Sequence, residues 1–375
     1  MGKWIRMLWL TLCLLGLGAR ADIVIGQSVP LSGVAGEYGR NMAQGAQAYF
    51  NWLNKQSGGI HGEQIKYVQY DDGFDFSRTL ANTRKLLAED KVVALMGYFS
   101  SDATASIVSR RWLDGGGVPL VGVSSSARTV REPGSRFLFH TRASQREEIA
   151  KLMAQMKRLG IARIGVFYQD DGFGQDGLAA AQEEAKSTGI VIAASASYPA
   201  NTLSVNTAVK RLADANPPAI LMISITKPSG LFIKAFRRLD SDAALYHTST
   251  VDFDELVRDI GPDLVHGLAI AQVYPYPGDN QNKLIKEFRS TLAAFAPSST
   301  PPGYAALEGY ITAKLLADAI GKAGPNPSRA KVYEALDNLG EVNYGGFRLS
   351  FGPNQRSGSH FVELTIANQK GELSK

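Results

Sequence analysis

The chain has 375 residues, 45% of them hydrophobic, so it is long enough for two domains with separate cores and too long for a single typical domain. Its formal net charge is +5, but three of the positive charges, Lys3, Arg6 and Arg20, precede the first acid, Asp22. The chain from Asp22 onward therefore has a net charge of only +2, which does not support nucleic-acid binding. The single cysteine, Cys13, lies in the same N-terminal stretch, which excludes disulfides, thiolate catalysis and cysteine-ligated zinc from the remainder.

Residues 1–21 have the pattern of a secretory signal peptide. A basic start is followed by an uncharged apolar stretch from Met7 to Leu17 and by small residues at Ala19 and Ala21. The apolar stretch is shorter than the roughly 20 residues that a membrane-spanning helix needs. We therefore expect cleavage before Asp22 and a periplasmic product that is not inserted in the membrane.

Strand-like and helix-like patterns alternate from residue 22 onward. Ser77 is the expected cap of the helix at 77–90. Strands separated by helices of this length favour a parallel sheet. The expected strands are 22–30, 64–72, 91–99 and 117–123, and the expected helices are 39–56, 77–90 and 100–114.

The series restarts after Arg142, which predicts a second α/β lobe. Its expected helices include 146–160, 174–189 and 230–240, and its expected strands include 163–171, 190–199 and 244–250. One more helix and a few strands follow the linker at 295–304. They are too few for a third domain, so we expect the chain to return to both lobes and to cross between them more than once, with a cleft beneath the hinge.

A series of motifs in this order resembles the leucine/isoleucine/valine-binding protein family, the periplasmic receptors of ABC importers. The motifs include "PLSG", "YG", "GGIHG", "YDDGFDFSRTLANTRKLL", "GYFSSDATA", "VPLVGVSSSARTVREP", "FHTRAS", "YQDDGFGQDGL" and "ALEGYITAKLLADAI". The resemblance implies two doubly wound parallel-sheet lobes joined by three crossovers and closing on a small ligand. On this basis we assign residues 22–141 plus 273–345 to lobe I and residues 142–272 plus 346–375 to lobe II.

Two serine-rich loops at strand ends of lobe I are the candidate binding site. Free amides and the helix dipole at a strand-to-helix junction favour an anion, and Ser100 and Ser101 stand at such a junction. The family resemblance implies that this loop and the loop from Ser124 through Ser125 to Ser126 hold a ligand carboxylate. The alternative is that these serines only cap helices and fill turns.

The resemblance places further residues of the cleft on both lobes. Tyr38 and Phe173 match aromatic positions, and Thr226 matches another aromatic position of the second lobe. Thr250 stands where amino-acid binders of the family present an acid to the ligand ammonium. A hydroxyl cannot neutralise an ammonium, so Asp252 is a candidate substitute; otherwise it only begins the next helix, and a ligand without an amine fits equally well.

Enzymatic and metal-binding functions have weaker support. The serines at 124–126 lack the G-x-S-x-G pattern of a hydrolase elbow, and the five histidines occur singly without ligand spacing. The acidic stretches at 70–75 and 168–176 lack the spacing of a calcium loop, so turn and helix-start roles are expected. We predict no catalytic residue, metal or cofactor.

The sequence thus predicts an exported solute-binding receptor for a small amino acid, amide or carboxylate, with the permease of an ABC importer as its partner. Two alternatives remain. The same fold could serve as a ligand sensor that docks to a signalling receptor, or one of the serines at 124–126 could serve an exported hydrolase.

The first testable prediction concerns export. Because the small residues at Ala19 and Ala21 end the signal pattern, the exported chain should begin at Asp22. Amino-terminal sequencing and intact mass of the protein from the periplasmic fraction check this. A chain that keeps residues 1–21, or that carries lipid on Cys13, would contradict it.

Overall fold

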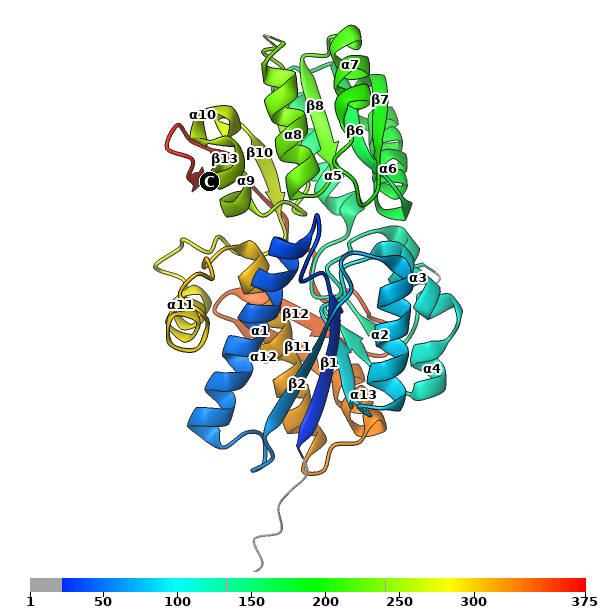
Figure 1. The fold of residues 1–375 in the computed structure, drawn as a ribbon, viewed down its shortest axis with the longest axis vertical. Coiled ribbons are helices and arrows are strands. Elements are labelled where there is room, and N and C mark those ends of the chain that lie inside the picture. Colours follow the sequence, from blue (N-terminus) through cyan, green and yellow to red (C-terminus); the bar gives the residue numbers. More distant parts are fainter. Residues whose placement is uncertain (1–21, 133, 240) are drawn as a thin grey trace, which may run out of the picture.

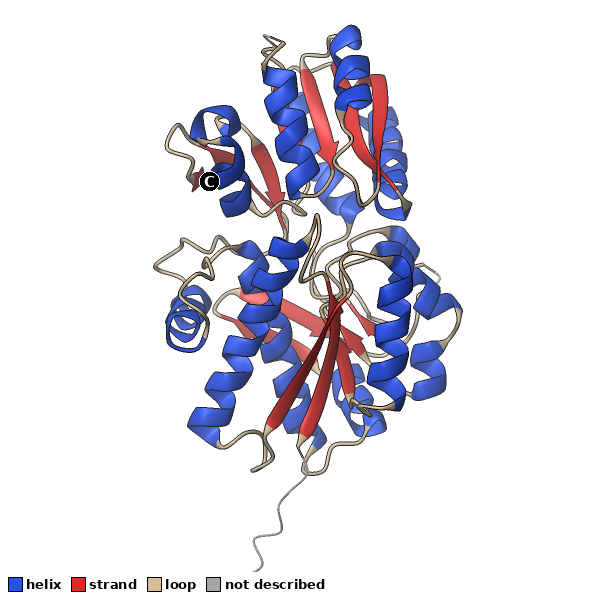
Figure 2. Cartoon of the chain, viewed as in Figure 1, coloured by secondary structure: helices blue, strands red, loops and turns tan. Residues whose placement is uncertain are grey.

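The computed structural model describes residues 22–132, 134–239 and 241–375, and the expected signal peptide lies outside them. The chain forms two α/β lobes (Figure 1). Blue, cyan and orange segments and the golden-yellow helix α11 make up one lobe, while green and yellow-green segments and the red C-terminal end make up the other. In each lobe helices cover the strands (Figure 2). The predicted two-lobe α/β architecture is confirmed.

The sheet of lobe I contains parallel strands in the order β2-β1-β3-β4-β5. Its strands are β1 (Ile23–Val29), β2 (Ile65–Asp71), β3 (Ala94–Met96), β4 (Leu120–Val121) and β5 (Leu138–Phe139). The helices between them are α1 (Gly36–Ser57), α2 (Phe76–Ala88), α3 (Ser101–Ser109) and α4 (Trp112–Gly116), followed by the 3₁₀ turn η1 (Arg128–Val130).

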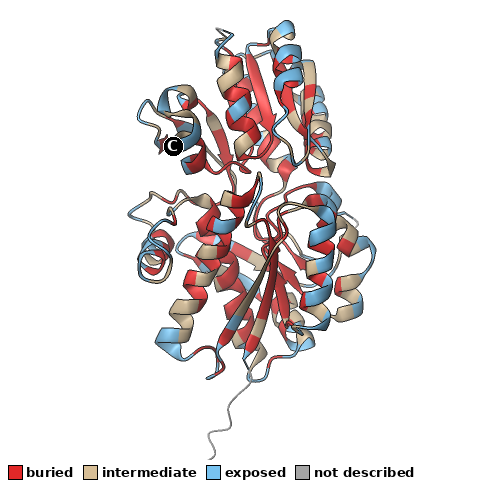
Figure 3. Ribbon diagram, viewed as in Figure 1, coloured by how far each residue is buried: buried red, intermediate tan, exposed pale blue. Residues whose placement is uncertain are grey.

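Both faces of this sheet are covered. Ile23 and Ile25 of β1 point into a core shared with α1 and the later helix α12 (Tyr304–Ala323), whereas Val24 packs in a second core on the other face. This alternation follows from the two-residue period of a strand. The central strands β3, β4 and β5 are apolar and fully buried, as is typical of a parallel sheet, whereas the edge strand β2 is only partly buried and carries polar side chains (Figure 3).

The sheet of lobe II has the order β14-β13-β10-β9-β8-β6-β7. Its strands are β6 (Arg163–Asp170), β7 (Val191–Pro199), β8 (Ala219–Ile223), β9 (Ala244–His247), β10 (Ala269–Gln272), β13 (Glu363–Ala367) and β14 (Leu373–Ser374). Strand β13 pairs antiparallel with β10, and β14 pairs antiparallel with β13, whereas the other neighbouring strands pair in parallel. Its helices are α5 (Gln145–Arg158), α6 (Gly172–Thr188), α7 (Asn206–Ala215), α8 (Thr226–Arg237), α9 (Phe253–Ile260) and α10 (Pro262–Val265).

The chain passes from one lobe to the other between β5 and α5, between β10 and α11 (Lys283–Phe295), and between β12 (Phe347–Phe351) and β13. The expected boundary at 345/346 falls inside a hairpin. That hairpin pairs β12 with β11 (Gly340–Tyr344) after helix α13 (Arg329–Asp337). Phe347, Leu349 and Phe351 pack in a core of lobe I, so residues 347–351 lie with lobe I and not with lobe II as expected.

One predicted helix start is wrong. Helix α2 begins after Asp75, whose side chain accepts a hydrogen bond from the Arg78 amide, so Asp75 and not Ser77 is the cap. A carboxylate at this position also interacts favourably with the helix dipole, which a serine two residues later does not. Asp171 caps α6 in the same way, by accepting from the Gly174 amide at 3.0 Å. The acidic stretches therefore have the expected helix-start roles.

None of the helices in the described part of the chain combines the length and the apolar character needed to cross a membrane.

The second prediction tests the closest helix contact in lobe I. A Cβ on Gly309 of α12 would stand 1.9 Å from the Met42 carbonyl oxygen of α1, and both atoms belong to rigid backbone. Gly309→Ala should therefore destabilise the fold by about 1–3 kcal/mol, as overpacking does. Gly321→Ala, in the same helix with open space around it, should be neutral or stabilise by about 0.5–1 kcal/mol. Urea unfolding measures both, and equal effects would contradict the packing argument.

Candidate functional site

A small cavity lies between the lobes, where the strand ends of the two sheets face each other. This is where ligands bind in open α/β sheets. The residues that line it are Phe74, Phe99, Ser101, Ser124 and Ser125 from lobe I and Gln169, Asp171, Phe173, Ile225 and Thr250 from lobe II. Both lobes thus contribute to one site.

The wall from lobe I includes the start of helix α3. Ser100 is its cap and accepts a hydrogen bond from the Ala103 amide at 3.3 Å, while the amides at the first two helix positions have no partner within the helix. Ser101 is buried, and its hydroxyl lies 2.7 Å from the Ser125 hydroxyl, so the two strand-end loops are joined directly. This wall offers hydrogen-bond donors and a positive dipole end, which favour an anion.

The three serines of the second loop have different environments. Ser125 lines the cavity, and its hydroxyl oxygen also accepts from the Ala127 amide at 3.3 Å. The Ser124 hydroxyl donates to Glu308 at 3.1 Å and accepts from Arg142 at 3.1 Å, so it is held from behind. Ser126 is buried, does not line the cavity and lies near the Glu148 carboxylate, with which its hydroxyl interacts.

Arg142 and Glu308 form a buried ion pair beside this loop. The two side chains are 0% and 1% exposed, and Nη1 of Arg142 lies 3.3 Å from Oε1 of Glu308. Burial is the largest single effect and disfavours the guanidinium charge, but Glu308 together with Tyr38, Glu148 and Tyr274 outweighs it and raises the pKa of Arg142 above its ordinary range. Arg142 also donates to the Ser124 carbonyl and, in lobe II, to the Ser249 hydroxyl. One side chain at the first crossover therefore contacts both lobes.

Tyr38 lies beside the same network. Its hydroxyl donates to Glu308 Oε2 at 2.7 Å, and its ring packs on Phe99 with centroids 5.3 Å apart. Phe99 in turn contacts Phe74 edge-on at 5.4 Å. Burial raises the pKa of Tyr38 well above its ordinary value and is the largest cause, and the charge of Glu308 raises it further. Tyr38 thus supports the aromatic side of the cavity without being one of its lining residues.

The wall from lobe II presents hydrogen-bond acceptors. The Thr250 hydroxyl donates its proton to the Ser224 carbonyl at 2.7 Å and accepts from the Thr248 hydroxyl at 3.1 Å, which leaves one oxygen lone pair for another partner. Asp171 accepts from the Gln169 side-chain amide at 2.6 Å while capping α6. Phe173 and Ile225 supply apolar surface and are 5% and 3% exposed.

The structure places Thr226 and Asp252 away from the cavity lining. Thr226 begins helix α8, and its hydroxyl accepts from the Asp252 amide at 2.9 Å. The Asp252 carboxylate caps α9 by accepting from the Glu255 amide at 3.2 Å and also accepts from the Asn41 side chain of lobe I at 2.9 Å. Asp252 thus caps a helix and joins the two lobes. The helix-start role is the alternative that the sequence offered to a role as the partner of a ligand ammonium.

Among the described residues, no histidine is hydrogen-bonded to the cavity serines Ser124 and Ser125. Their hydroxyls have Glu308, Arg142 and Ser101 as partners. His247 is occupied by Ser229 at 2.8 Å and by the Thr248 carbonyl at 2.7 Å. The described residues also contain no group of three or more His, Cys, Asp or Glu side chains that could hold a metal ion.

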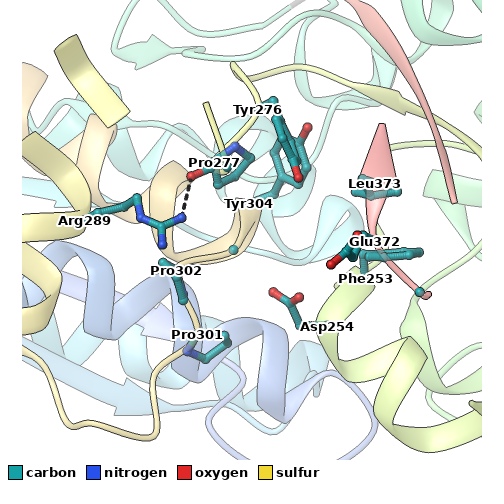
Figure 4. A pocket seen from close by; sticks show the side chains of 13 residues that line it. Phe253, Asp254, Tyr276, Pro277, Arg289, Pro301, Pro302, Tyr304, Glu372 and Leu373 are labelled. Carbon is teal, nitrogen blue, oxygen red and sulfur yellow. Dashed lines mark hydrogen bonds between the residues drawn. The ribbon is translucent and has the colours of Figure 1, made fainter. Parts of the chain in front are cut away.

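A second cavity of about 700 Å³ lies at the junction of the lobes, away from the serine loops (Figure 4). Asp254 and Glu372 of lobe II face Pro302 and Tyr304 of lobe I across it. Arg289 donates to the Pro277 carbonyl at its edge, at 3.3 Å. None of the predicted site residues lines this cavity, so it does not correspond to the site that the sequence indicates.

Several functional residues were missed in the sequence. Phe99 directly precedes the serines at 100–101, and Phe74 lies in the acidic stretch at 70–75, so their positions at strand ends were a usable signal. Asp171 was identified only as a helix-start residue. Arg142 and Glu308 are 166 residues apart, and nothing local in the sequence pairs them.

Comparison with known proteins gives consistent matches. A family model described as periplasmic binding protein matches residues 22–372. A Leu/Ile/Val-binding protein homolog from Brucella abortus is 24% identical over 354 residues, covering 90% of this chain and 86% of the relative. A substrate-binding periplasmic protein from Ralstonia solanacearum has 34% identity and a TM-score of 0.90, over 94% and 99% of the two chains. An extracellular ligand-binding receptor from Verminephrobacter eiseniae has 26% identity and a TM-score of 0.88, over 94% and 100%.

The third prediction concerns the buried ion pair. Glu308→Gln keeps the size of the side chain but removes its charge, which leaves the Arg142 guanidinium buried without its main partner. We expect a loss of about 3–5 kcal/mol in the free energy of unfolding. The double variant Arg142→Met/Glu308→Gln should lose less than the sum of the two single variants, because neither charge is then left alone.

Urea unfolding of the single and double variants measures this coupling. Lys210→Ala removes an ion pair on the exposed surface of helix α7 and serves as the control, with no measurable change expected. Strictly additive losses for Arg142 and Glu308 would contradict a coupled pair.

Proposed function

Because the chain belongs to the periplasmic binding protein family, we propose that it is an exported receptor that captures a small polar metabolite between its lobes and delivers it to an ABC importer. The observation that carries this proposal is the cavity at the facing strand ends, lined by residues of both lobes. A ligand there touches both lobes at once and stabilises their closed arrangement.

The proposed ligand carries a carboxylate or carbonyl end held by lobe I. The hydroxyls of Ser101 and Ser125 and the first amides of α3 form the anion-binding part of the cavity. Phe74, Phe99 and Phe173 border the same space and suit an apolar body. The amino-acid ligands named for relatives of the Leu/Ile/Val-binding type have both parts.

Contacts on both sides of the cavity fit a receptor that closes. Asn41 and Asp252 join the lobes at 2.9 Å, and Glu37 pairs with Arg258 at 2.7 Å near them. On the α6 side, the Arg128 amide donates to Asp176 across the gap at 2.6 Å. These contacts are few and polar, so closure can be reversed by hinge motion at the crossovers.

The fourth prediction concerns ligand binding by the serines. Much of the binding comes from backbone amides, so Ser101→Ala and Ser125→Ala should each weaken binding by about 0.5–1.5 kcal/mol, or up to about 3 if the lost hydroxyl faces a charge. Ser125→Leu should do more damage, because its side chain fills space that the ligand needs. Ser109→Ala, at the far end of α3, is the control and should bind as the wild type does.

The ligand for these titrations comes from a thermal-shift screen of amino acids, amides and carboxylates. A ligand at 100 times its dissociation constant stabilises the folded protein by roughly 2.7 kcal/mol. Calorimetric titration then measures each variant, and chromatography of the mixture tests whether the ligand is recovered intact. Consumption of the ligand that one serine substitution abolishes would contradict the receptor and support the hydrolase.

A further inference from the structure

We propose that Asp171 holds a cationic amine of the ligand, so that the ligand is a zwitterion bound with its carboxylate on lobe I and its amine at the start of helix α6. This inference rests on the proposed receptor function. It replaces Asp252 as the candidate partner of an ammonium, and it makes Asp171 a residue that determines specificity.

The charges of the cavity lining carry the argument. Its described residues are phenylalanines, serines, Gln169, Ile225, Thr250 and Asp171, and Asp171 alone among them has an acidic or basic side chain. No lysine, arginine or histidine lines this space. An anionic ligand without an amine would therefore meet a single negative charge, with no cation in the lining to balance it.

The Asp171 carboxylate still has room for a partner. Oδ1 accepts from the Gly174 amide at 3.0 Å, and Oδ2 accepts from the Gln169 side chain at 2.6 Å. The Tyr198 hydroxyl donates to Oε1 of Gln169, which fixes the amide so that its nitrogen faces Asp171. The Phe173 amide also interacts with this carboxylate. A carboxylate offers about four lone-pair sites, so acceptor capacity for one more donor remains.

This carboxylate lacks a counter-ion. No ion pair joins Asp171 to a basic side chain anywhere in the described residues. Burial raises the pKa of Asp171, and Asp102 of lobe I adds to the effect. The Asp102 carboxylate accepts from the Gly172 amide at 3.4 Å, so it stands beside Asp171 when the lobes are closed. A partly buried anion without a cationic partner is unfavourable, and a ligand cation would offset the charge of Asp171.

The hydroxyl groups also make the two cavity walls different, because one wall has a proton to donate to the ligand and the other can only accept one. On lobe I, Ser101 and Ser125 share a hydrogen bond that uses one of their two protons, which leaves one proton to donate to the ligand. On lobe II, the Thr250 hydroxyl donates its proton to the Ser224 carbonyl and can only accept from the ligand. A ligand with an acceptor at one end and a donor at the other matches this division.

The test is a calorimetric titration of α-, β- and γ-amino acids, each beside the carboxylic acid that lacks its amine. The wild type should bind the best amino acid about tenfold to a hundredfold more tightly than its amine-free counterpart, as a charged hydrogen bond implies. Asp171→Asn should remove this difference by weakening the amino acid alone. Asparagine is a good helix cap, so α6 should still form, and an unchanged melting temperature verifies that.

Asp102→Asn is the matched control, because it removes the neighbouring charge without altering the cavity lining. It should change either affinity by less than about threefold, in keeping with a screened charge outside the contact. Equal effects of the two substitutions would overturn a direct role of Asp171. An amine-free acid that binds the wild type as tightly as its amino acid would overturn the inference and leave the receptor intact, whereas binding of neither class would overturn the proposed ligand class itself.

Discussion

The guanidinium of Arg142 is the buried charge around which the two lobes are arranged. It sits at the first crossover, fully enclosed, between Glu308 and the Ser124 loop of lobe I and Ser249 of lobe II. A charge in such a place is tolerated only with a partner, and both terminal nitrogens of Arg142 have hydrogen-bond acceptors. Arg142 therefore fixes the positions of helix α12, the serine loop and the lobe II loop relative to one another. The centre of the hinge is polar and not apolar.

This constraint also decides which serines can face a ligand. The ion pair of Arg142 and Glu308 forms hydrogen bonds with the carbonyl and the hydroxyl of Ser124, so the position of Ser124 in the loop is fixed. Ser125, one residue later, points toward Ser101 and the cavity. A binding group positioned by a rigid second layer loses little entropy when the ligand arrives. Ser124 and Ser125 thus both line the cavity, with the Ser124 hydroxyl held by the ion pair, whereas Ser126 is buried outside the lining.

Sequence reasoning reached the parts of this protein that depend on local patterns. The alternation of strands and helices, the two lobes and the serine loops all follow from periodicity and from turn residues. It failed where distant segments meet. Arg142 and Glu308 carry no mark in the sequence of being a pair, Asp75 competed with Ser77 for the same cap, and the hairpin around Tyr344 and Phe347 joins lobe I through packing alone.

The unequal chemistry of the two cavity walls has a consequence for closure. Lobe I presents a hydroxyl proton and helix-end amides, whereas lobe II presents a carboxylate and a hydroxyl lone pair. A ligand that satisfies only one wall leaves polar groups of the other desolvated and unpaired when the lobes meet, which costs more than a missing contact in water. In the proposed receptor, closure therefore distinguishes ligands by whether both of their ends find hydrogen-bond partners. A molecule that binds one lobe alone does not stabilise the closed arrangement.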